Sequence, residues 1–166
     1  MSMKIVRNTP EQLIVSDTPW FTGILLGTIT AVLITAGTGD ALNGDLEGGL
    51  GMALGGGGMF GLGFAVFVQR AQAILNRETN ELILRRRTVI RYTETRHALA
   101  DLSRAVLDTT TDSDGDRLYR PVLMLEGASR GPHPIVAAYT SSGAPQQVVT
   151  AINDWLKQAL IPQATA

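Results

Sequence analysis

Two histidines, His97 and His133, are the side chains best suited to acid–base catalysis or metal binding near neutral pH. They lie far apart in the sequence, and no neighbouring motif supplies the third ligand that a catalytic zinc ion needs. No nucleophile motif accompanies them either. The 166 residues include no cysteine, which excludes disulfides, thiolate metal sites and thiol catalysis. We therefore expect no enzyme activity, no metal ion and no cofactor.

Two short motifs formally match known ligand-binding patterns. Residues 56–61 (GGGMFG) fit G-x-G-x-x-G, but they lie inside an apolar run and lack the strand–turn–helix context of a dinucleotide site. Residues 112–116 (DSDGD) resemble the start of a calcium loop, yet Arg117 and Leu123 stand where an EF-hand needs glycine and glutamate. We expect glycine packing at the first motif and a polar hairpin turn at the second.

A group of arginines is the one charged feature that points to a ligand: Arg70, Arg77, Arg85, Arg87 and Arg91. Basic residues beside a cytoplasmic leaflet can bind anionic headgroups, at ~1 kcal/mol for each well-placed charge. The alternative is that these arginines control topology and form ordinary cross-strand pairs with Glu78, Glu81 and Glu94. The net charge of −1 argues against a nucleic-acid partner.

The arginines follow two uncharged apolar segments, residues 20–36 and 50–68, which an acidic loop of residues 37–49 joins. At ~1.5 Å per helical residue, each segment approaches the ~30 Å of a bilayer core. Trp20 and Phe21 suit the headgroup boundary. The pattern predicts a transmembrane helical hairpin in contact with membrane lipids. A cleaved signal peptide, or two core helices of a soluble protein, are the alternatives.

Small residues recur every fourth position in both segments, and this spacing lets two backbones approach closely. The first row is Gly23, Gly27, Ala31 and Thr35, and the second is Ala53, Gly57, Gly61 and Ala65. We expect the two rows to pack on each other, with Gly57 and Gly61 near Gly23 and Gly27. A homo-oligomer or a larger integral membrane protein is the competing use of these faces.

Charge predicts the orientation of the hairpin. The loop contains Asp40, Asp45 and Glu47 and no base, whereas all 14 lysines and arginines lie before Asn8 or after Gln69. Basic flanking segments stay in the cytoplasm. We expect a bacterial inner-membrane protein with both termini in the cytoplasm.

The sequence predicts four segments along the chain. Residues 20–69 form the hairpin, 70–162 form a small β domain, 1–19 supply strands that join this domain, and 163–166 are a tail. Expected strands cover residues 3–7, 12–15, 81–91 (extending towards His97, with a bulge at 85–87), 122–125 and 135–139. Residues 99–107 suit a helical turn or a strand. An amphipathic helix follows residues 141–145 and ends at Pro162.

This order of elements resembles the bacterial pleckstrin-homology-like domains. The resemblance covers residues 71–160 and, with less detail, 3–17. It rests on the phrases LNRETNELILRRR (75–87), YRPVLMLEG (119–127) and TSSGAPQQVVTAINDWL (140–156). Similar membrane proteins place a two-helix hairpin beside such a domain. The resemblance implies an α+β membrane protein whose antiparallel β domain is closed by the C-terminal helix and serves binding or assembly.

These observations favour a non-enzymatic accessory, assembly or regulatory subunit, which binds another integral membrane protein or complex through its hairpin and β domain. The alternative is a glycine-zipper homo-oligomer that forms a pore or channel. The second segment's glycines suggest that alternative, but neither helix carries a polar stripe to line a water-filled path.

Overall fold

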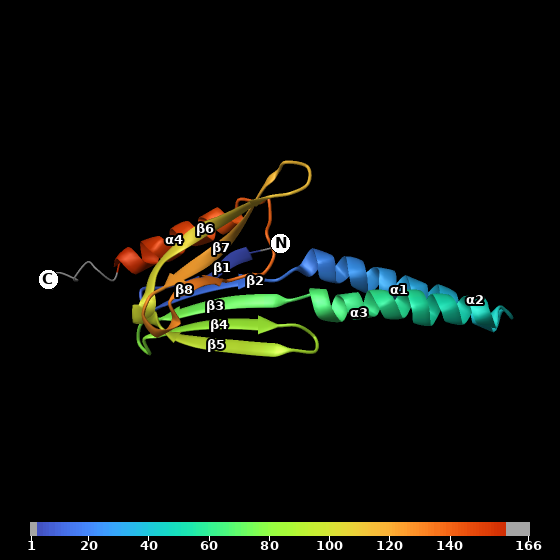
Figure 1. The fold of residues 1–166 in the computed structure, drawn as a ribbon. Helices are drawn as coiled ribbons and strands as arrows, with labels where there is room; N and C mark the ends of the chain where they lie inside the picture. The colour runs from blue at the N-terminus through green and yellow to red at the C-terminus, as the bar shows by residue number, and fades with distance from the viewer. Residues whose placement is uncertain (1–2, 159–166) are drawn as a thin grey trace. The chain divides into compact units, whose positions relative to one another are not determined.

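The computed structural model describes residues 3–158, and these residues form two compact units (Figure 1). The first unit comprises the described residues of Met1–Thr18, Arg70–Arg86 and Thr93–Ala166. The second comprises Pro19–Gln69 and Arg87–Tyr92. The strands that precede the first long helix therefore lie in the same unit as the strands that follow the second.

The first unit contains a five-stranded sheet whose strands follow chain order: β1 (Met3–Asn8), β2 (Gln12–Asp17), β3 (Arg70–Asn76), β4 (Glu81–Arg87) and β5 (Tyr92–Ala98). β2 pairs antiparallel with β1 and with β3, and the arrows in Figure 1 show β4 running opposite to β3 and β5. Leu13 and Val15 alternate along β2 and are fully buried, which is the period of a strand with one face on a core.

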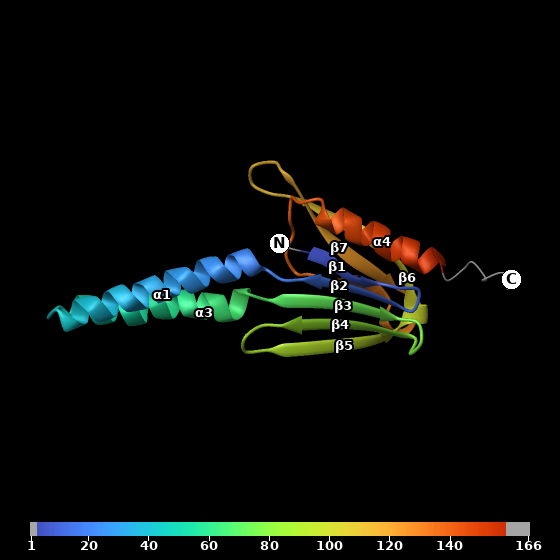
Figure 2. The same cartoon turned by 180° about the vertical axis from the view of Figure 1, so that it is seen from behind.

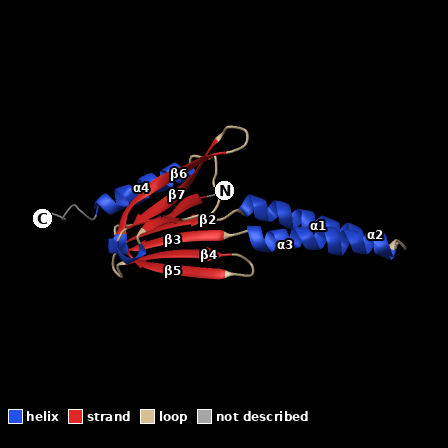
Figure 3. Ribbon diagram, in the orientation of Figure 1, coloured by secondary structure: helices blue, strands red, loops and turns tan. Residues whose placement is uncertain are grey.

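A second, three-stranded antiparallel sheet has the order β6 (Leu102–Thr111), β7 (Arg117–Leu125) and β8 (Gly131–Pro134) (Figure 3). Short 3-10 turns precede β6 and β8: η2 (Leu99–Asp101) and η3 (Gly127–Ser129). The polar turn between β6 and β7 forms as predicted. The carboxylate of Asp112 accepts the N–H groups of Asp114 and Asp116, at 3.0 and 2.9 Å, and Gly115 supplies the positive φ of +88°.

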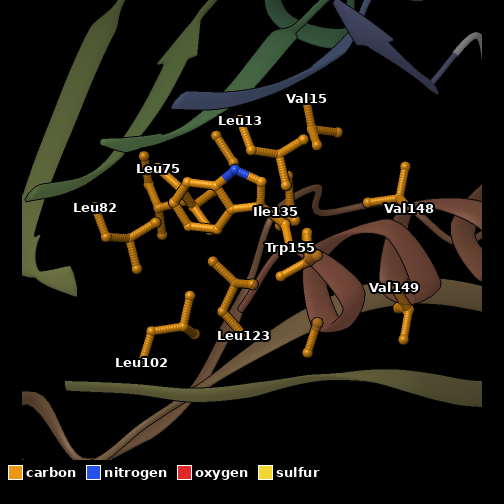
Figure 4. Close-up of a cluster of buried hydrophobic side chains, with 14 of the residues drawn as sticks. Leu13, Val15, Leu75, Leu82, Leu102, Leu123, Ile135, Val148, Val149 and Trp155 are labelled. Carbon is orange, nitrogen blue, oxygen red and sulfur yellow. The ribbon is translucent and has the colours of Figure 1, made fainter. Parts of the chain in front are cut away.

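The amphipathic helix α4 (Ala144–Gln158) contributes one face to the core of this unit. Trp155 is 1% exposed and lies among aliphatic side chains of both sheets (Figure 4). Its neighbours in the close-up are Leu13, Val15, Leu75, Leu82, Leu102, Leu123, Ile135, Val148 and Val149. The antiparallel sheets and this helix confirm the predicted α+β class.

Polar contacts also hold α4 in place. The Trp155 indole N–H donates to the carbonyl of Thr9 at 2.6 Å, and the Arg77 guanidinium lies 3.8 Å from the centre of the indole ring. Arg77 further donates to the carbonyls of Pro10 and Trp155. One arginine thus joins the β1–β2 turn to the last turn of the helix, where orphan carbonyls need donors.

The second unit is built on a helical hairpin: α1 (Trp20–Leu42) returns through α2 (Leu46–Leu50), the π-helical segment η1 (Gly51–Gly57) and α3 (Gly58–Phe67) (Figure 2). Trp20–Leu42 and Leu46–Val66 are both long and apolar enough to cross a membrane. The expected loop of residues 37–49 is wrong, because only residues 43–45 connect the helices. Gly44 turns the chain at a φ of +105°, and the Asp45 carboxylate caps α2 through the N–H of Gly48 at 3.0 Å.

Two expected strands differ from the structure. The long strand of residues 81–91 is two strands, β4 and β5, separated by a turn at residues 88–91. Residues 135–139 form no named strand, although Ile135 is 2% exposed and its N–H donates to the Pro121 carbonyl at 3.1 Å. An isolated bridge to Tyr119 forms at the next residue, Thr140. The third strand of this sheet, β8, instead ends at Pro134, just before the apolar run.

Candidate functional site

The outer surface of the hairpin is apolar and exposed. Only 6% of the most apolar window of the first helix, and 11% of that of the second, is buried within the described chain. Ile24, Leu54 and Leu62 are 59%, 71% and 69% exposed. A core helix of a soluble domain would show the opposite pattern, so this surface needs an apolar environment that the described chain itself does not supply.

Three of the five threonine hydroxyls of α1 bond to backbone carbonyls within the helix. Thr30, Thr35 and Thr38 each donate to the carbonyl four residues earlier, at 2.8, 2.8 and 2.7 Å. Such bonds let a hydroxyl face hydrocarbon without an unpaired donor. These side chains therefore require no water and do not mark a wet path along the helix.

Gly37 and Gly49 lie against the backbone of the opposite helix. A β-carbon at Gly37 would lie 2.5 Å from the Gly49 carbonyl oxygen and 2.6 Å from the amide nitrogen of Ala53. A β-carbon at Gly49 would meet the Gly37 carbonyl and lie 2.5 Å from the amide nitrogen of Ala41. Backbone thus packs on backbone, which only glycine permits at this separation.

Farther along the second span, Gly57 and Gly61 face side chains of α1. A β-carbon at Gly57 would lie 2.7 Å from Cγ1 of Ile34, and one at Gly61 would lie 3.6 Å from Cγ2 of Thr30. We expected Gly57 and Gly61 to face Gly23 and Gly27, and this expectation is wrong. The contact at Gly37 and Gly49 sets the register of the hairpin, and this register brings Ile34 and Thr30 opposite the two glycines.

The other predicted packing residues divide between the inside and the outside of the hairpin. Ala53 lies against Gly37, and Gly23 lies beside Phe64 and Val68. Ala65 is half-buried. On the outside, Ala31 is exposed, and a β-carbon at Gly27 would find no atom within 4 Å.

The second helix has an outward row of its own, formed by Gly51, Gly55 and Gly58. β-Carbons on these residues would also find no atom within 4 Å. We call these three residues the outer glycine row. Since each glycine costs about 1 kcal/mol of helix propensity relative to alanine, the row lowers helix stability without improving any contact inside the described chain.

The five predicted lipid-contacting arginines fall into two groups. Arg77 is held by Trp155 and backbone carbonyls, as described above, and Arg85 forms a cross-strand ion pair with Glu94 at 2.8 Å. Arg70, Arg87 and Arg91 are exposed, and their side chains form no ion pair or hydrogen bond with the part of the chain that the structure describes. Only these last three present free guanidinium groups.

The two histidines, distant in sequence, meet in space. The rings of His97 and His133 lie 4.8 Å apart, and His133 Nε2 is 2.9 Å from the carbonyl oxygen of Ser129. Burial, followed by the charge of His133, lowers the pKa of His97 below its usual value. Among the described residues, no group of three or more histidine, aspartate or glutamate side chains could hold a metal ion.

A polar cluster missed by the sequence reasoning borders a groove on the three-stranded sheet. Asp108 accepts Arg120 and the hydroxyl of Tyr139, each at 2.8 Å. The Tyr139 bond, and then Arg120, lowers the pKa of the Asp108 carboxyl. The adjacent groove of about 350 Å³ is lined by Val106, Leu107, Val122, Met124, Pro132 and Pro134. Arg120 is neutralised by Asp108, so the groove has no free charge from this pair for an anion.

Comparison with protein-family models finds none that matches the sequence, and comparison with curated proteins finds no match either. The function is therefore inferred from the geometry of the structure. Sequence spacing identified the glycine-rich hairpin but not its packing register. It also missed the histidine pair and the cluster around Asp108, because both join residues from separate strands.

Proposed function

We propose that this protein is a non-enzymatic accessory or assembly subunit of the bacterial inner membrane, anchored by its hairpin and bound through it to another integral membrane protein. The outer glycine row carries this proposal. Gly51, Gly55 and Gly58 are exposed on an apolar helix and have open space beyond them. In lipid, such small residues allow a neighbouring helix to approach closely.

The β domain fits the same role. Its core, which α4 closes together with the two antiparallel sheets, supports the proposal of a pleckstrin-homology-like recognition domain. His133 of the His97–His133 pair contacts a backbone carbonyl, that of Ser129, and the charge of Asp108 is used by Arg120 and Tyr139. The internally bonded threonines of α1 count against the alternative of a water-filled pore.

The test is extraction from the native membrane in lipid nanodiscs, comparing wild-type protein with Gly55→Leu and a matched Gly39→Leu variant. Both glycines have open space within the chain, so neither leucine should disturb the hairpin itself. We expect a co-purifying membrane protein at fixed stoichiometry with the wild type and with Gly39→Leu, and its loss with Gly55→Leu. An isolated monomer in every case would contradict the proposal, as would ion conductance by the purified chain.

A further inference from the structure

The turn between β4 and β5 breaks the usual rules for turn sequences. Residues 88–91 read Thr-Val-Ile-Arg, without the glycine, asparagine or proline that tight turns favour. The turn is nevertheless closed: the Thr88 N–H donates to the Arg91 carbonyl at 2.8 Å, and the Arg91 N–H donates to the Thr88 hydroxyl at 3.0 Å. Val89 and Ile90 at its tip are 65% and 74% exposed. Two branched apolar side chains are thus held in the open.

Free positive charge surrounds this apolar tip. Arg87 and Arg91 flank it, and both are exposed without a side-chain partner in the described chain. Farther along the same two strands the other arginines have partners: Arg85 pairs with Glu94, Arg96 pairs with Glu81 at 3.3 Å, and Arg86 donates to the Pro134 carbonyl. The free positive charge is therefore concentrated at the turn.

The covalent chain places this turn at the end of the sheet from which both helices depart. β2 ends at Asp17, opposite Ala71 near the start of β3, and β4 returns antiparallel to β3 so that it ends there too (Figure 1). Only two residues separate Asp17 from Trp20, and only two separate Phe67 from Arg70. Three Cα steps span at most about 11 Å.

From these observations we infer that the β4–β5 turn inserts Val89 and Ile90 into the interface of the bilayer, while Arg87 and Arg91 bind anionic headgroups. This inference rests on the proposed membrane insertion of the hairpin. If the spans cross the bilayer, their short links hold this sheet end within reach of the headgroup region, which is several ångströms thick. The two apolar side chains suit the boundary with the acyl chains, and the two flanking arginines suit the headgroups above it.

Depth measurements on the full chain in vesicles test the inference. The natural absence of cysteine allows a fluorescent label at one introduced site, namely Ile90→Cys, Ser113→Cys in the exposed β6–β7 turn, or Val32→Cys on the apolar surface of α1. In vesicles containing phosphatidylglycerol, a lipid-borne quencher should quench the labels at 90 and 32 severalfold more than the label at 113. Neutralising Arg87 and Arg91 with glutamine should lower the ratio of inserted to withdrawn turn by roughly fivefold per arginine, which weakens quenching at 90 and leaves quenching at 32 unchanged.

The outcomes separate this inference from the proposed function. Quenching at 32 but not at 90 would overturn the role of the turn and leave membrane insertion intact. No quenching at 32 would overturn both. A label at 90 that is shielded from an aqueous quencher, yet unaffected by the lipid-borne one, would assign the turn to a protein contact and overturn the inference. Equal quenching at 90 in vesicles of phosphatidylcholine alone would show that Arg87 and Arg91 do not bind anionic headgroups.

Discussion

At the scale of single residues, Gly37 and Gly49 are the positions where the hairpin has least room. Alanine at either position would force its β-carbon to within about 2.5 Å of backbone atoms that cannot rotate away. Overpacking of this kind costs about 1–3 kcal/mol, which exceeds the ~1 kcal/mol gained by replacing a helical glycine with alanine. We expect Gly37→Ala and Gly49→Ala to lower the thermal stability of the helices in detergent, measured by circular dichroism.

Gly39→Ala is the matched control, because Gly39 lies two residues from Gly37 in the same helix and faces open space. It should leave the midpoint unchanged or raise it slightly. Equal losses for Gly37→Ala and Gly39→Ala would show that the close approach of the helices does not stabilise the hairpin.

The same residues show what sequence spacing can and cannot predict. Glycine and alanine at every fourth position correctly indicated that these helices carry small-residue surfaces. Spacing does not say which of several rows faces the other helix. The row that begins at Gly23 turns outward at Gly27 and Ala31, whereas Gly37 belongs to a different row. Register depends on where two backbones meet, which is a property of both helices together.

At the scale of elements, the packing of α4 against both sheets depends on Trp155. Trp155→Ala would remove a fully buried indole, a change that typically costs about 3–5 kcal/mol. Trp155→Phe would keep most of the apolar contact but lose the bond to Thr9 and the better stacking partner of Arg77, at a cost of about 1–2 kcal/mol. Urea unfolding of the full chain in detergent, followed by the circular dichroism of the strands, should show this order.

Arg77→Met separates the polar from the apolar part of this contact, since methionine retains an unbranched apolar stem over the ring. We expect a loss comparable to that of Trp155→Phe, and little further loss when the two changes are combined. Strict additivity would mean that the arginine and the indole stabilise the helix independently.

The β4–β5 hairpin explains one failure of prediction at this scale. Val89 and Ile90 favour strands, and no glycine, asparagine or proline interrupts residues 81–97, so the sequence indicated one long strand. The chain instead forms a turn, which hydrogen bonds between Thr88 and Arg91 close. Local propensity is overridden here, and such conflicts concentrate at functional sites.

The polar turn at residues 112–116 was predicted because its signal is local. Asp112 bonds to amides two and four residues ahead, and Gly115 adopts a positive φ. The buried stretch that begins at Ile135 shows the reverse case. Its apolar residues suggested a strand, but burial in the core requires no partner strand, and β8 formed on the residues just before it.

At the scale of the whole molecule, the acidic turn of the hairpin and the basic β domain predict opposite sides of the membrane. Residues 43–45 and Glu47 lie at the tip of the hairpin, and none of the 14 lysines and arginines lies between residues 8 and 69. If the two spans cross the membrane, retention of basic segments in the cytoplasm predicts the β domain inside and the tip outside. The Asp112–Asp116 turn of the β domain should be as exposed to solvent as the tip, but to the other compartment.

Single cysteines in this cysteine-free chain can test that arrangement in cells. Asn43→Cys, at the tip, should react with a membrane-impermeant thiol reagent added outside the inner membrane. Ser113→Cys should react only after the membrane is permeabilised. Both positions are exposed in the folded chain, so a difference between them reports the compartment rather than burial. Labelling of Ser113→Cys alone would reverse the topology, and labelling of both without permeabilisation would mean that the two helices do not cross the membrane as a hairpin.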